Sequence, residues 1–352
     1  MRLQSYVPPK RALIIELMNQ YLDKKSDERT DLPFFKDTID RFRTFIPNGK
    51  LIRGVLVMLC YEMMGKRALD VAAAALAIEF TQSTLLMHDD IMDQDENRRG
   101  ARTVYAQYMD HARESGYGNP LLYGQSLAVC VGDIGFYFAF ELLNSLSAEN
   151  EVLRRVLTEY AREIQYVGAA QMADVDLSYR KTEASVEDIL TVYRYKTGRY
   201  SFSLPMKLGA ILGGAPEETI DALDRLGEEL GIMFQIHDDY LGLTGNENQI
   251  GKPVGTDIKS DKKTIIRKLL FERATGADAV VLNQSFGNVE LTAEDHAAIL
   301  RILSRTGISA EIERMMEERA SAASDIIRSI SVPDDYKHIL TDLVTFNKER
   351  TK

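Results

Sequence analysis

Helical periodicity runs along almost the whole chain, and it restricts the fold more than any other feature of the sequence. Apolar residues recur every three or four positions, and only nine prolines interrupt 352 residues. Valine, isoleucine and threonine never alternate over a strand-length run bounded by turns, so no β-sheet is expected. The pattern predicts helices over residues 10–25, 34–45, 51–64, 68–93, 123–146, 152–177, 186–212, 216–241, 262–274, 293–304, 309–330 and 334–348.

The chain shows no internal division. No composition shift, flexible linker or solenoid-like repeat separates one part from another. We therefore expect a single all-α domain over residues 1–352, built as one large helical bundle. Two long connections, around 94–103 and 244–261, interrupt the pattern, and loops of this length usually carry function. Residues 276–291 are the least helix-like stretch outside these connections.

The charge balance argues against some classes of partner. There are 53 acidic and 43 basic residues, which gives a net charge of −10. A nucleic-acid carrier normally presents a basic face, so a nucleic-acid partner is not expected. An acidic chain that binds an anion must do so locally, with a few placed cations or with a metal ion.

Cysteine usage and the N-terminal residues favour a cytoplasmic protein. Cys60 and Cys130 stand in separate apolar runs without a partner at metal-ligand spacing, so both are expected to be buried reduced thiols. The first residues lack the apolar region and cleavage site of a signal peptide. The apolar run over 71–78 is far shorter than a bilayer span, so no integral membrane segment is expected.

Aspartates close the predicted helix over 68–93. Asp89 and Asp93 are four residues apart, so on a helix their carboxylates share one face and repel each other. Negative charge at a helix C-terminus also opposes the helix dipole. A solvated helix end is the alternative explanation, but a divalent cation removes both costs. Mg²⁺ prefers one or two carboxylates together with phosphate oxygens and water, so the stretch favours a magnesium site.

A second acidic helix end strengthens this interpretation. The residues FQIHDDYL over 234–241 again end an apolar helix with paired aspartates, Asp238 and Asp239, and a long connection again follows. Either pair alone is a weak signal, but two acidic helix ends that project into one cavity would build a multi-metal site. His88 and His237 stand beside these pairs. Because Mg²⁺ prefers oxygen ligands, we expect both histidines to support or pack rather than to bind metal.

Basic residues accompany both clusters. They are Arg98 and Arg99 after the first, Lys252, Lys259, Lys262 and Lys263 after the second, and Lys50 and Arg53 at a helix start. Each alone could be a solvated charge. Carboxylates that bind metal, flanked by Arg and Lys, nevertheless match what a diphosphate requires, since metal ions bridge its oxygens while cations take the remaining charge.

With these motifs in place, the sequence resembles the trans-isoprenyl diphosphate synthases (polyprenyl synthetase family). The matching motifs are GKLIRG at 49–54, DDIMDQDENRRG at 89–100, YKTG at 195–198, FQIHDDYLG at 234–242 and GKPVGTDIKSDKKT at 251–264. The resemblance implies an all-α homodimer of the isoprenoid synthase type with a central active-site cavity. It also implies that Mg²⁺, two to three ions per site and replaceable by Mn²⁺, ionises an allylic diphosphate, to which isopentenyl diphosphate adds head to tail.

Carried over residue by residue, the resemblance assigns a role to each motif position. The metal ligands would be Asp89, Asp93, Asp238 and Asp239, with Asp90 in support. The allylic diphosphate would be held by Arg98, Lys196, Lys252 and Lys262. Isopentenyl diphosphate would be held by Lys50, Arg53, Gln82 and Arg99. Thr197 and Gln235 would direct oxygen dipoles at the developing cation.

Three positions depart from the family pattern. Gly242 stands where a third aspartate is frequent, Gly54 where the motif usually has proline, and Gln82 where many members have histidine. The departures lower the expected number of carboxylate ligands but remove no cation. The chemistry otherwise fits, since a carbocation requires an apolar, water-free pocket and released pyrophosphate can accept the final proton.

The product length follows from side-chain volume on the first aspartate helix. Leu85, Thr84, Thr81 and Phe80 lie one to three turns before Asp89. Leu85 and Thr84 leave a growing tail room, and Phe80 is a candidate floor, which predicts C20, geranylgeranyl diphosphate, with C25 or C15 as alternatives. Replacing Thr84 by phenylalanine should shift the product towards C15.

Two rival functions remain open. A class I terpene cyclase shares the first aspartate motif, but it needs Ser or Thr and then Glu after the second, where this chain has Gly242 and Asn246. A non-catalytic subunit of a heteromeric synthase would have lost its aspartates, which this chain retains. We therefore expect a magnesium-dependent prenyltransferase.

Overall fold

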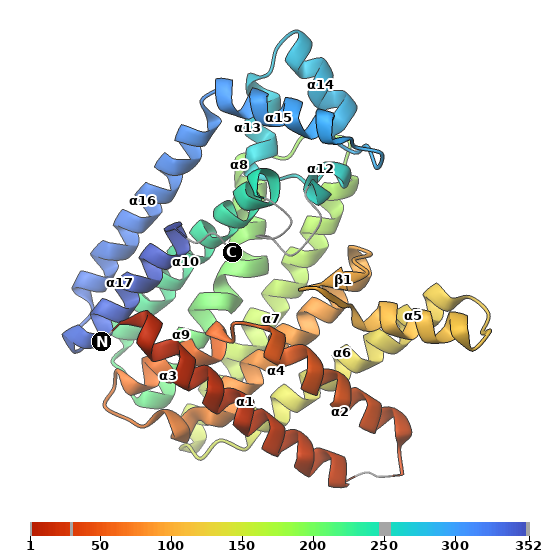
Figure 1. Ribbon diagram of the computed structural model, residues 1–352. Coiled ribbons are helices and arrows are strands. Elements are labelled where there is room, and N and C mark those ends of the chain that lie inside the picture. Colours follow the sequence, from red (N-terminus) through yellow and green to blue (C-terminus); the bar gives the residue numbers. More distant parts are fainter. Residues whose placement is uncertain (1, 29–30, 246–254, 350–352) are drawn as a thin grey trace. The chain divides into compact units, whose positions relative to one another are not determined.

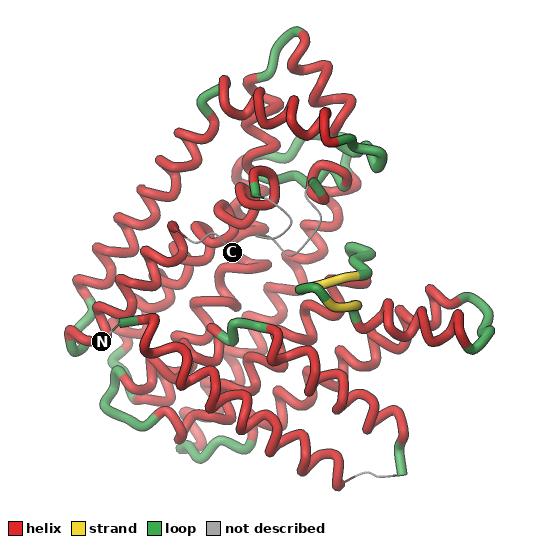
Figure 2. Tube along the Cα trace, viewed as in Figure 1, coloured by secondary structure: helices red, strands yellow, loops and turns green. Residues whose placement is uncertain are grey.

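The computed structural model describes residues 2–28, 31–245 and 255–349, and helices form nearly all of this part of the chain (Figures 1 and 2). The predicted all-α fold class is therefore confirmed. The chain divides into two compact units. Unit 1 comprises Met1–Thr158 and Pro205–Pro216, and unit 2 comprises Glu159–Leu204 and Glu217–Lys352. Each unit is described by itself.

Unit 1 contains the first aspartate motif. Its elements are α1 (Leu3–Glu28), α2 (Pro33–Phe45), η1 (Ile46–Asn48), α3 (Ile52–Glu62), η2 (Ala68–Val71), α4 (Ala72–Met92), β1 (Asn97–Arg98), β2 (Ala101–Arg102), α5 (Val104–Glu114), α6 (Pro120–Asn144), the first part of α7 (Asn150–Tyr179) and most of α9 (Leu204–Gly213).

Unit 2 contains the second aspartate motif. Its elements are the rest of α7, then α8 (Val186–Val192), η3 (Tyr193–Ser203), α10 (Glu217–Thr244), α12 (Thr256–Lys259), α13 (Ile265–Arg273), α14 (Ala277–Ser285), α15 (Ala293–Arg305), α16 (Ile308–Ser329) and α17 (Asp334–Glu349). Helices α16 and α17 pack side by side (Figure 1). Thr292 caps α15, because its hydroxyl accepts the N–H of Asp295.

Small residues bring α4 and α6 of unit 1 into close contact. A Cβ atom at Gly132 would lie 2.2 Å from Nε2 of His88, and one at Gly135 would lie 2.1 Å from Oγ1 of Thr84. Only glycine fits at these two points of α6. The hydroxyl of Thr84 also donates a hydrogen bond to the carbonyl of Gly132 (3.0 Å). This contact fixes α4, and with it the direction in which the aspartates at its end can point.

An aromatic cluster joins four helices of unit 1. The ring of Phe80 on α4 makes edge-to-face contacts with Tyr21 of α1, Phe42 of α2 and Phe138 of α6, with ring centroids 5.3–5.6 Å apart. Such pairs each contribute about 0.5–1.5 kcal/mol beyond the burial of their area. Phe80 is fully buried, so its ring is a fixed part of the core.

Two glycines allow the backbones of η3 and α10 to touch in unit 2. A Cβ atom at Gly231 would lie 2.1 Å from the Cα of Gly198, so neither helix could approach the other with a larger residue there. Segment η3 is a π-helix rather than an α-helix. Extended π-helical turns are rare and frequently mark functional sites. Here the π-helix carries Lys196 and Thr197 of the YKTG motif.

The structure corrects several sequence predictions. A two-stranded antiparallel hairpin, β1–β2, occupies the connection in which no sheet was expected (Figure 2). It is too short to show alternation, and its turn needs positive φ at Arg99 (53°) and Gly100 (77°), as in type I′ hairpins. The predicted helix over 186–212 is instead α8, η3 and α9 in succession. Cys130 is exposed rather than buried, whereas Cys60 is buried as predicted.

Three helices were missed from the sequence: α5, α14 and the four-residue α12, which lies in the predicted connection over 244–261. Helix α5 buries Tyr105, Tyr108, Met109 and Ala112, which do have helical spacing. Helix α14 lies within residues 276–291, the stretch with the weakest helical pattern. Only two of its residues are buried, so its sequence lacks the continuous apolar stripe by which a core helix is found.

Two helical stretches have the length and composition of membrane spans, which the sequence prediction did not anticipate. Ala68–Met92 and Pro120–Asn144 have mean hydropathies of 1.3 and 1.6, and 67% and 44% of the respective windows are buried inside the protein. Core helices meet the same criteria, so this is weak evidence for a membrane location. Ala68–Met92 includes the core helix α4, which ends in the first aspartate motif.

Candidate active site

The first aspartate motif lies at the C-terminal end of α4. Asp93 caps the helix, with its N–H donating to the carbonyl of Asp89 (2.8 Å). The three carboxylates differ in their surroundings, since Asp93 is exposed, Asp89 is half-buried and only 1% of the Asp90 side chain is exposed. The helix therefore presents two carboxylates outward and keeps one inside.

Arg98 compensates the buried carboxylate. Its Nε donates a short hydrogen bond to Oδ1 of Asp90, and its Nη2 lies 3.7 Å from Asp89 and 3.6 Å from Asp95. Burial raises the pKa of Asp90 to about 6, although Arg98 opposes the shift. Oδ2 of Asp90 and Nη2 of Arg98 make no hydrogen bond within the described residues. Oδ2 of Asp90 can therefore still accept a hydrogen bond from a ligand, and Nη2 of Arg98 can still donate one.

The β1–β2 hairpin brings Arg99 towards the GKLIRG motif. A Cβ atom at Gly49 would lie 3.0 Å from Nη1 of Arg99. Burial, and then the charges of Arg98 and Arg53, hold the pKa of Arg99 below its usual value. The guanidinium groups of Arg98 and Arg53 therefore repel that of Arg99, which favours the binding of an anion near Arg99.

Glu79 of α4 holds the start of α3, which carries Arg53, against the first aspartate helix. It is buried, and its carboxylate accepts the N–H of Gly54 at the start of α3 (2.7 Å). Burial raises its pKa, and the Gly54 N–H, Arg53 and Arg99 oppose that shift. A Cβ at Gly54 would lie 3.2 Å from Cγ of Glu79 and 2.9 Å from the carbonyl of Ala75, which explains a glycine where proline is frequent.

Two further predicted residues, Lys50 and Gln82, lie just before α3 and on α4. Lys50 is exposed and precedes Leu51, whose φ of 54° turns the chain into α3. Arg11 of α1 holds this turn by donating to the carbonyls of Pro47 (2.5 Å) and Gly49 (3.2 Å). Gln82 is buried on α4, seven residues before Asp89 and so on the same helical face.

The second aspartate motif lies near the end of α10. Asp238 is half-buried, whereas Asp239 is only 4% exposed. Nε2 of Gln235 donates to Oδ1 of Asp239 (2.9 Å), and the hydroxyl of Tyr193 donates a short hydrogen bond to its Oδ2. In this pair too, one carboxylate faces outward and the other is held inside.

Charges on the segment after α10 act on Asp239. Burial raises its pKa to about 7, Lys262 opposes that shift and Asp257 adds to it. These three residues, together with Thr264 and Arg267, line a small pocket in unit 2. Arg267 fixes the segment because its guanidinium binds Asp261 (2.5 Å) and Glu183 (2.5 Å). Lys252, which was predicted to hold the allylic diphosphate, lies outside the described residues.

Asp257 occupies the space beside Gly242. A Cβ atom at Gly242 would lie 3.0 Å from Oδ2 of Asp257. Gly242 is the position at which the family often has a third aspartate. A carboxylate is thus present at this point, but it comes from the following segment of the chain.

Lys196 and Thr197 lie in the middle of η3. Nζ of Lys196 binds Oδ2 of Asp174 on α7 (2.5 Å), and both side chains are largely buried. Thr197 is half-buried. Asp174 was not predicted, and no feature of the sequence distinguishes it from the other acidic residues of α7.

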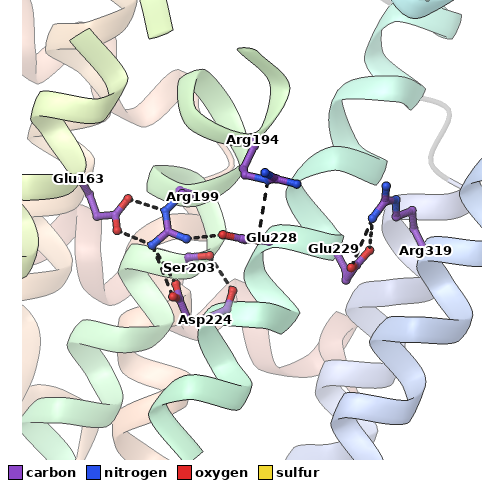
Figure 3. A network of polar contacts seen from close by, with 8 residues as sticks. All are labelled: Glu163, Arg194, Arg199, Ser203, Asp224, Glu228, Glu229 and Arg319. Carbon is purple, nitrogen blue, oxygen red and sulfur yellow. Dashed lines mark hydrogen bonds and ion pairs between the residues drawn. The ribbon is translucent and has the colours of Figure 1, made fainter. Parts of the chain in front are cut away.

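A charged network anchors η3 on the C-terminal side of Lys196. Arg199 binds Glu163 of α7 through two nitrogens (2.6 and 2.9 Å), and also Asp224 (3.3 Å) and Glu228 of α10 (Figure 3). Ser203 adds a hydrogen bond to the carbonyl of Asp224 (2.8 Å) (Figure 3). Because Glu163 is only 1% exposed, removing Arg199 would leave a buried charge without its partner.

The donor set of each unit fits magnesium better than metals that need a preformed cage. Within residues 2–28, 31–245 and 255–349 no three His, Cys, Asp or Glu side chains converge on one point. Mg²⁺ usually takes only one or two protein carboxylates and fills its remaining positions with phosphate oxygens and water. Asp89 with Asp93 in unit 1, and Asp238 in unit 2, provide such partial sets.

The predicted chain-length residues all lie on α4. Thr81 and Thr84 are buried, and Oγ1 of Thr81 donates to the carbonyl of Ala77 (2.8 Å). Leu85 is half-buried and shares the helical face of Asp89, whereas Phe80 points into the aromatic cluster. His88 packs against α6, with its ring 3.3 Å from the carbonyl of Val129, in line with a packing role.

Comparisons with known proteins agree on one family. The profile described as Polyprenyl synthetase matches residues 39–303. The geranylgeranyl diphosphate synthase of Methanosarcina mazei is 30% identical over 259 residues, covering 74% of this chain and 73% of that protein. A (2E,6E)-farnesyl diphosphate synthase of Mycobacterium tuberculosis is 29% identical over 312 residues, covering 86% and 80%. The crystal structure of a geranylgeranyl pyrophosphate synthase from Corynebacterium glutamicum, complexed with isoprenyl diphosphate and magnesium, aligns with a TM-score of 0.91 and 29% identity, covering 98% of this chain and 99% of that one.

Proposed function

Since the chain belongs to the polyprenyl synthetase family, we propose that it is a geranylgeranyl diphosphate synthase. It would condense isopentenyl diphosphate with an allylic diphosphate, head to tail, to give an all-trans C20 product. The observation that carries this proposal is the pairing, in each unit, of a helix-terminal aspartate motif with nearby cations. Similarity to geranylgeranyl synthases supports the C20 product, and similarity to a farnesyl synthase keeps C15 as the alternative.

Both aspartate motifs would serve one reaction. Asp89 and Asp93 in the first motif and Asp238 in the second would hold Mg²⁺, two to three ions in all, with Mn²⁺ as a substitute. When bound, these ions neutralise the diphosphate and help it to leave. Asp90 would act through Arg98, to which it is hydrogen-bonded. Asp239, also predicted as a ligand, would contribute its remaining lone pairs while Tyr193 and Gln235 hold it in place.

The cations would divide between the two substrates. Arg98, Lys196, Lys252 and Lys262 would hold the allylic diphosphate. In the described structure Arg98 and Lys196 bind aspartates, so substrate phosphate would share or replace these partners. Lys50, Arg53, Gln82 and Arg99 would hold isopentenyl diphosphate, a role supported by the repulsion that Arg53 and Arg98 exert on Arg99.

Carbocation chemistry would depend on oxygen dipoles and on the exclusion of water. Thr197 and Gln235 would direct their side-chain oxygens at the developing positive charge, which preorganised dipoles stabilise more strongly than water does. Released pyrophosphate would accept the proton that ends each condensation, so no separate protein base is needed.

Product length would be set along α4. Leu85 shares the face of Asp89, so a growing chain would run past it and past Thr81. Thr84, which is held against α6, would leave this path open, and Phe80, which is held by three other rings, would be its floor.

We also propose that the chain works as one catalytic domain, is cytoplasmic and forms a homodimer. Four exposed apolar side chains lie along one side of α6: Leu122, Val129, Tyr137 and Phe140. A second copy of the chain would cover this stripe. Sedimentation analysis of the wild type and of Phe140→Asp tests the dimer, which the substitution should dissociate.

The function is tested by incubating the purified protein with Mg²⁺, isopentenyl diphosphate and geranyl or farnesyl diphosphate. Chromatography of the products should show elongation that stops at C20. A cyclic hydrocarbon would favour a terpene cyclase, and a product that stops at C15 would favour a farnesyl diphosphate synthase. The absence of elongation would contradict the proposal.

A further inference from the structure

The hydroxyl of Tyr193 joins three separate segments of unit 2. The side chain is buried, and its oxygen accepts the backbone N–H of Ile265 at the start of α13 (3.0 Å). Because an N–H group can only donate, the hydroxyl proton is left for Oδ2 of Asp239 on α10. Tyr193 itself is the first residue of the π-helix η3. One hydroxyl thus links η3, α10 and α13.

Each of the three linked segments carries a group of the proposed site. Lys196 follows Tyr193 by three residues, Asp238 precedes Asp239, and Lys262 precedes Ile265 by three residues. The glycine contact between η3 and α10 and the Arg199 network fix η3 on the other side of Lys196. The Tyr193 hydroxyl holds η3 on the N-terminal side of Lys196. It also joins η3 to the start of α13, because it accepts the N–H of Ile265.

The carboxylate of Asp239 receives its hydrogen bonds from neutral donors. Gln235 donates to Oδ1 and Tyr193 to Oδ2, while Lys262 contributes charge. A carboxylate held on both oxygens keeps one orientation, and residues that orient metal-site carboxylates control metal affinity. Gln235 lies on α10 itself, four residues before Asp239, so only Tyr193 of these two ties the carboxylate to another segment.

We propose that Tyr193 is a positioning residue for the second aspartate motif. Its hydroxyl holds the carboxylate of Asp239 and the start of α13 in place. Asp238, Lys196 and Lys262 thereby keep the geometry that binds a magnesium–diphosphate complex. The inference rests on the proposed function, because it concerns the same site. It adds a residue that lies outside every motif by which the sequence was recognised.

The alternative is that the hydroxyl only satisfies a buried carboxylate. Tyr108 provides a control, because it is also buried and its hydroxyl donates a short hydrogen bond to Asp37 in unit 1, and neither residue belongs to a motif. Tyr193→Phe and Tyr108→Phe each delete one tyrosine–carboxylate hydrogen bond and keep the ring, and Tyr193→Phe also removes the acceptor of the Ile265 N–H. A purely structural role would give both variants losses of thermal stability and nothing more.

The experiment measures binding by isothermal titration calorimetry of the full chain with inorganic pyrophosphate at saturating Mg²⁺, and of Mg²⁺ at fixed pyrophosphate. Tyr193→Phe should weaken both affinities about tenfold, as deletions of orienting residues around metal sites do. Tyr108→Phe should bind as the wild type does. In steady-state assays, Tyr193→Phe should raise KM for the allylic diphosphate and for Mg²⁺ more than it lowers kcat.

Amide hydrogen exchange gives an independent readout. Tyr193→Phe should accelerate exchange at Ile265, which loses its acceptor, and leave the core of α10 protected as in the wild type. Unchanged pyrophosphate and Mg²⁺ affinities in a folded Tyr193→Phe variant would overturn the inference. A wild-type protein that neither binds the magnesium–pyrophosphate complex nor elongates would instead overturn the proposed function.

Discussion

The two aspartate motifs follow the same plan but differ in how they hold their inner carboxylate. In each pair one aspartate faces outward and the next is buried, Asp90 in α4 and Asp239 in α10. Asp90 is bound by a guanidinium group, whereas Asp239 receives its hydrogen bonds from a phenol and an amide. The difference shows that the first motif carries its own compensating cation. The second depends on neutral donors and on the charge of Lys262.

Loss of an outward carboxylate should have the largest effect, and it should be equal in the two motifs. Asp89→Asn and Asp238→Asn should each lower kcat by about 10³-fold or more, because each removes a proposed metal ligand worth several kcal/mol. Steady-state assays with Mg²⁺ measure this. Asp325→Asn, at an exposed ion pair on α16, is the matched control and should retain full activity. Full activity in either motif variant would remove that motif from the mechanism.

The inner carboxylates should differ in their contribution to stability. Asp90→Asn removes the charge-assisted hydrogen bond of the buried Arg98 and leaves it only the longer ion pairs with Asp89 and Asp95, so the free energy of unfolding should fall by about 1.5–3 kcal/mol. Asp239→Asn keeps an acceptor for Tyr193 and removes a buried charge, so its cost should stay below about 1 kcal/mol. Urea denaturation without Mg²⁺ measures both. Equal losses would show that the two motifs are held in the same way.

Product length should respond to the first motif's helix alone. Leu85→Phe should shift the product from C20 towards C15, because the ring would enter the proposed path beside Asp89. Thr84→Phe should shift it in the same direction but at a cost in stability, because Thr84 already lies against Gly132 and Gly135. The control Leu241→Phe on α10 should leave product length unchanged. Chromatography of the prenyl products distinguishes these outcomes, and an unchanged spectrum in both α4 variants would contradict the proposed path.

The smallest effect should be a pH dependence of stability, stronger for the second motif. Burial raises the pKa of Asp239 to about 7 and that of Asp90 to about 6, so the folded protein binds these protons more tightly than the unfolded chain does. The stability contributed by these groups is therefore fully present below about pH 4 and is lost as the pH rises through 6 and 7. Asp239→Asn should remove most of the decline between pH 6 and 7, above the pKa of Asp90, measured by thermal unfolding without Mg²⁺. A decline that is unchanged in this variant would show that other groups cause the loss of stability.

Helical periodicity predicted most of the fold, because a buried helix face leaves a regular trace in the sequence. It failed where that trace is weak or misleading. Helix α14 buries little, the strands of the hairpin contain two residues each, and the π-helix η3 has the periodicity of the α-helices that flank it. Exposed Cys130 shows the opposite error. Its apolar run includes the buried Ala128 and Val131, but Cys130 itself lies on the outer side of α6 with the exposed Val129.

The residues of the candidate site that belong to its motifs could be predicted from the sequence. Paired aspartates and nearby cations can be read from the sequence because spacing on one helix puts them on one face. Their partners cannot, because Asp174, Glu79 and Tyr193 come from other elements and meet the motifs only through packing. Asp257 was passed over although it lies within a quoted motif, because only the fold brings it beside Gly242.

Single-turnover elongation tests the central claim, that both aspartate motifs drive one magnesium-dependent prenyl transfer. The purified protein is mixed with labelled isopentenyl diphosphate and excess farnesyl diphosphate, with Mg²⁺ or with a chelator. The account predicts labelled geranylgeranyl diphosphate and one equivalent of pyrophosphate per condensation with Mg²⁺, and neither product with the chelator or in Asp89→Asn and Asp238→Asn. Elongation that persists in either variant, or pyrophosphate release without chain growth in the wild type, would contradict it.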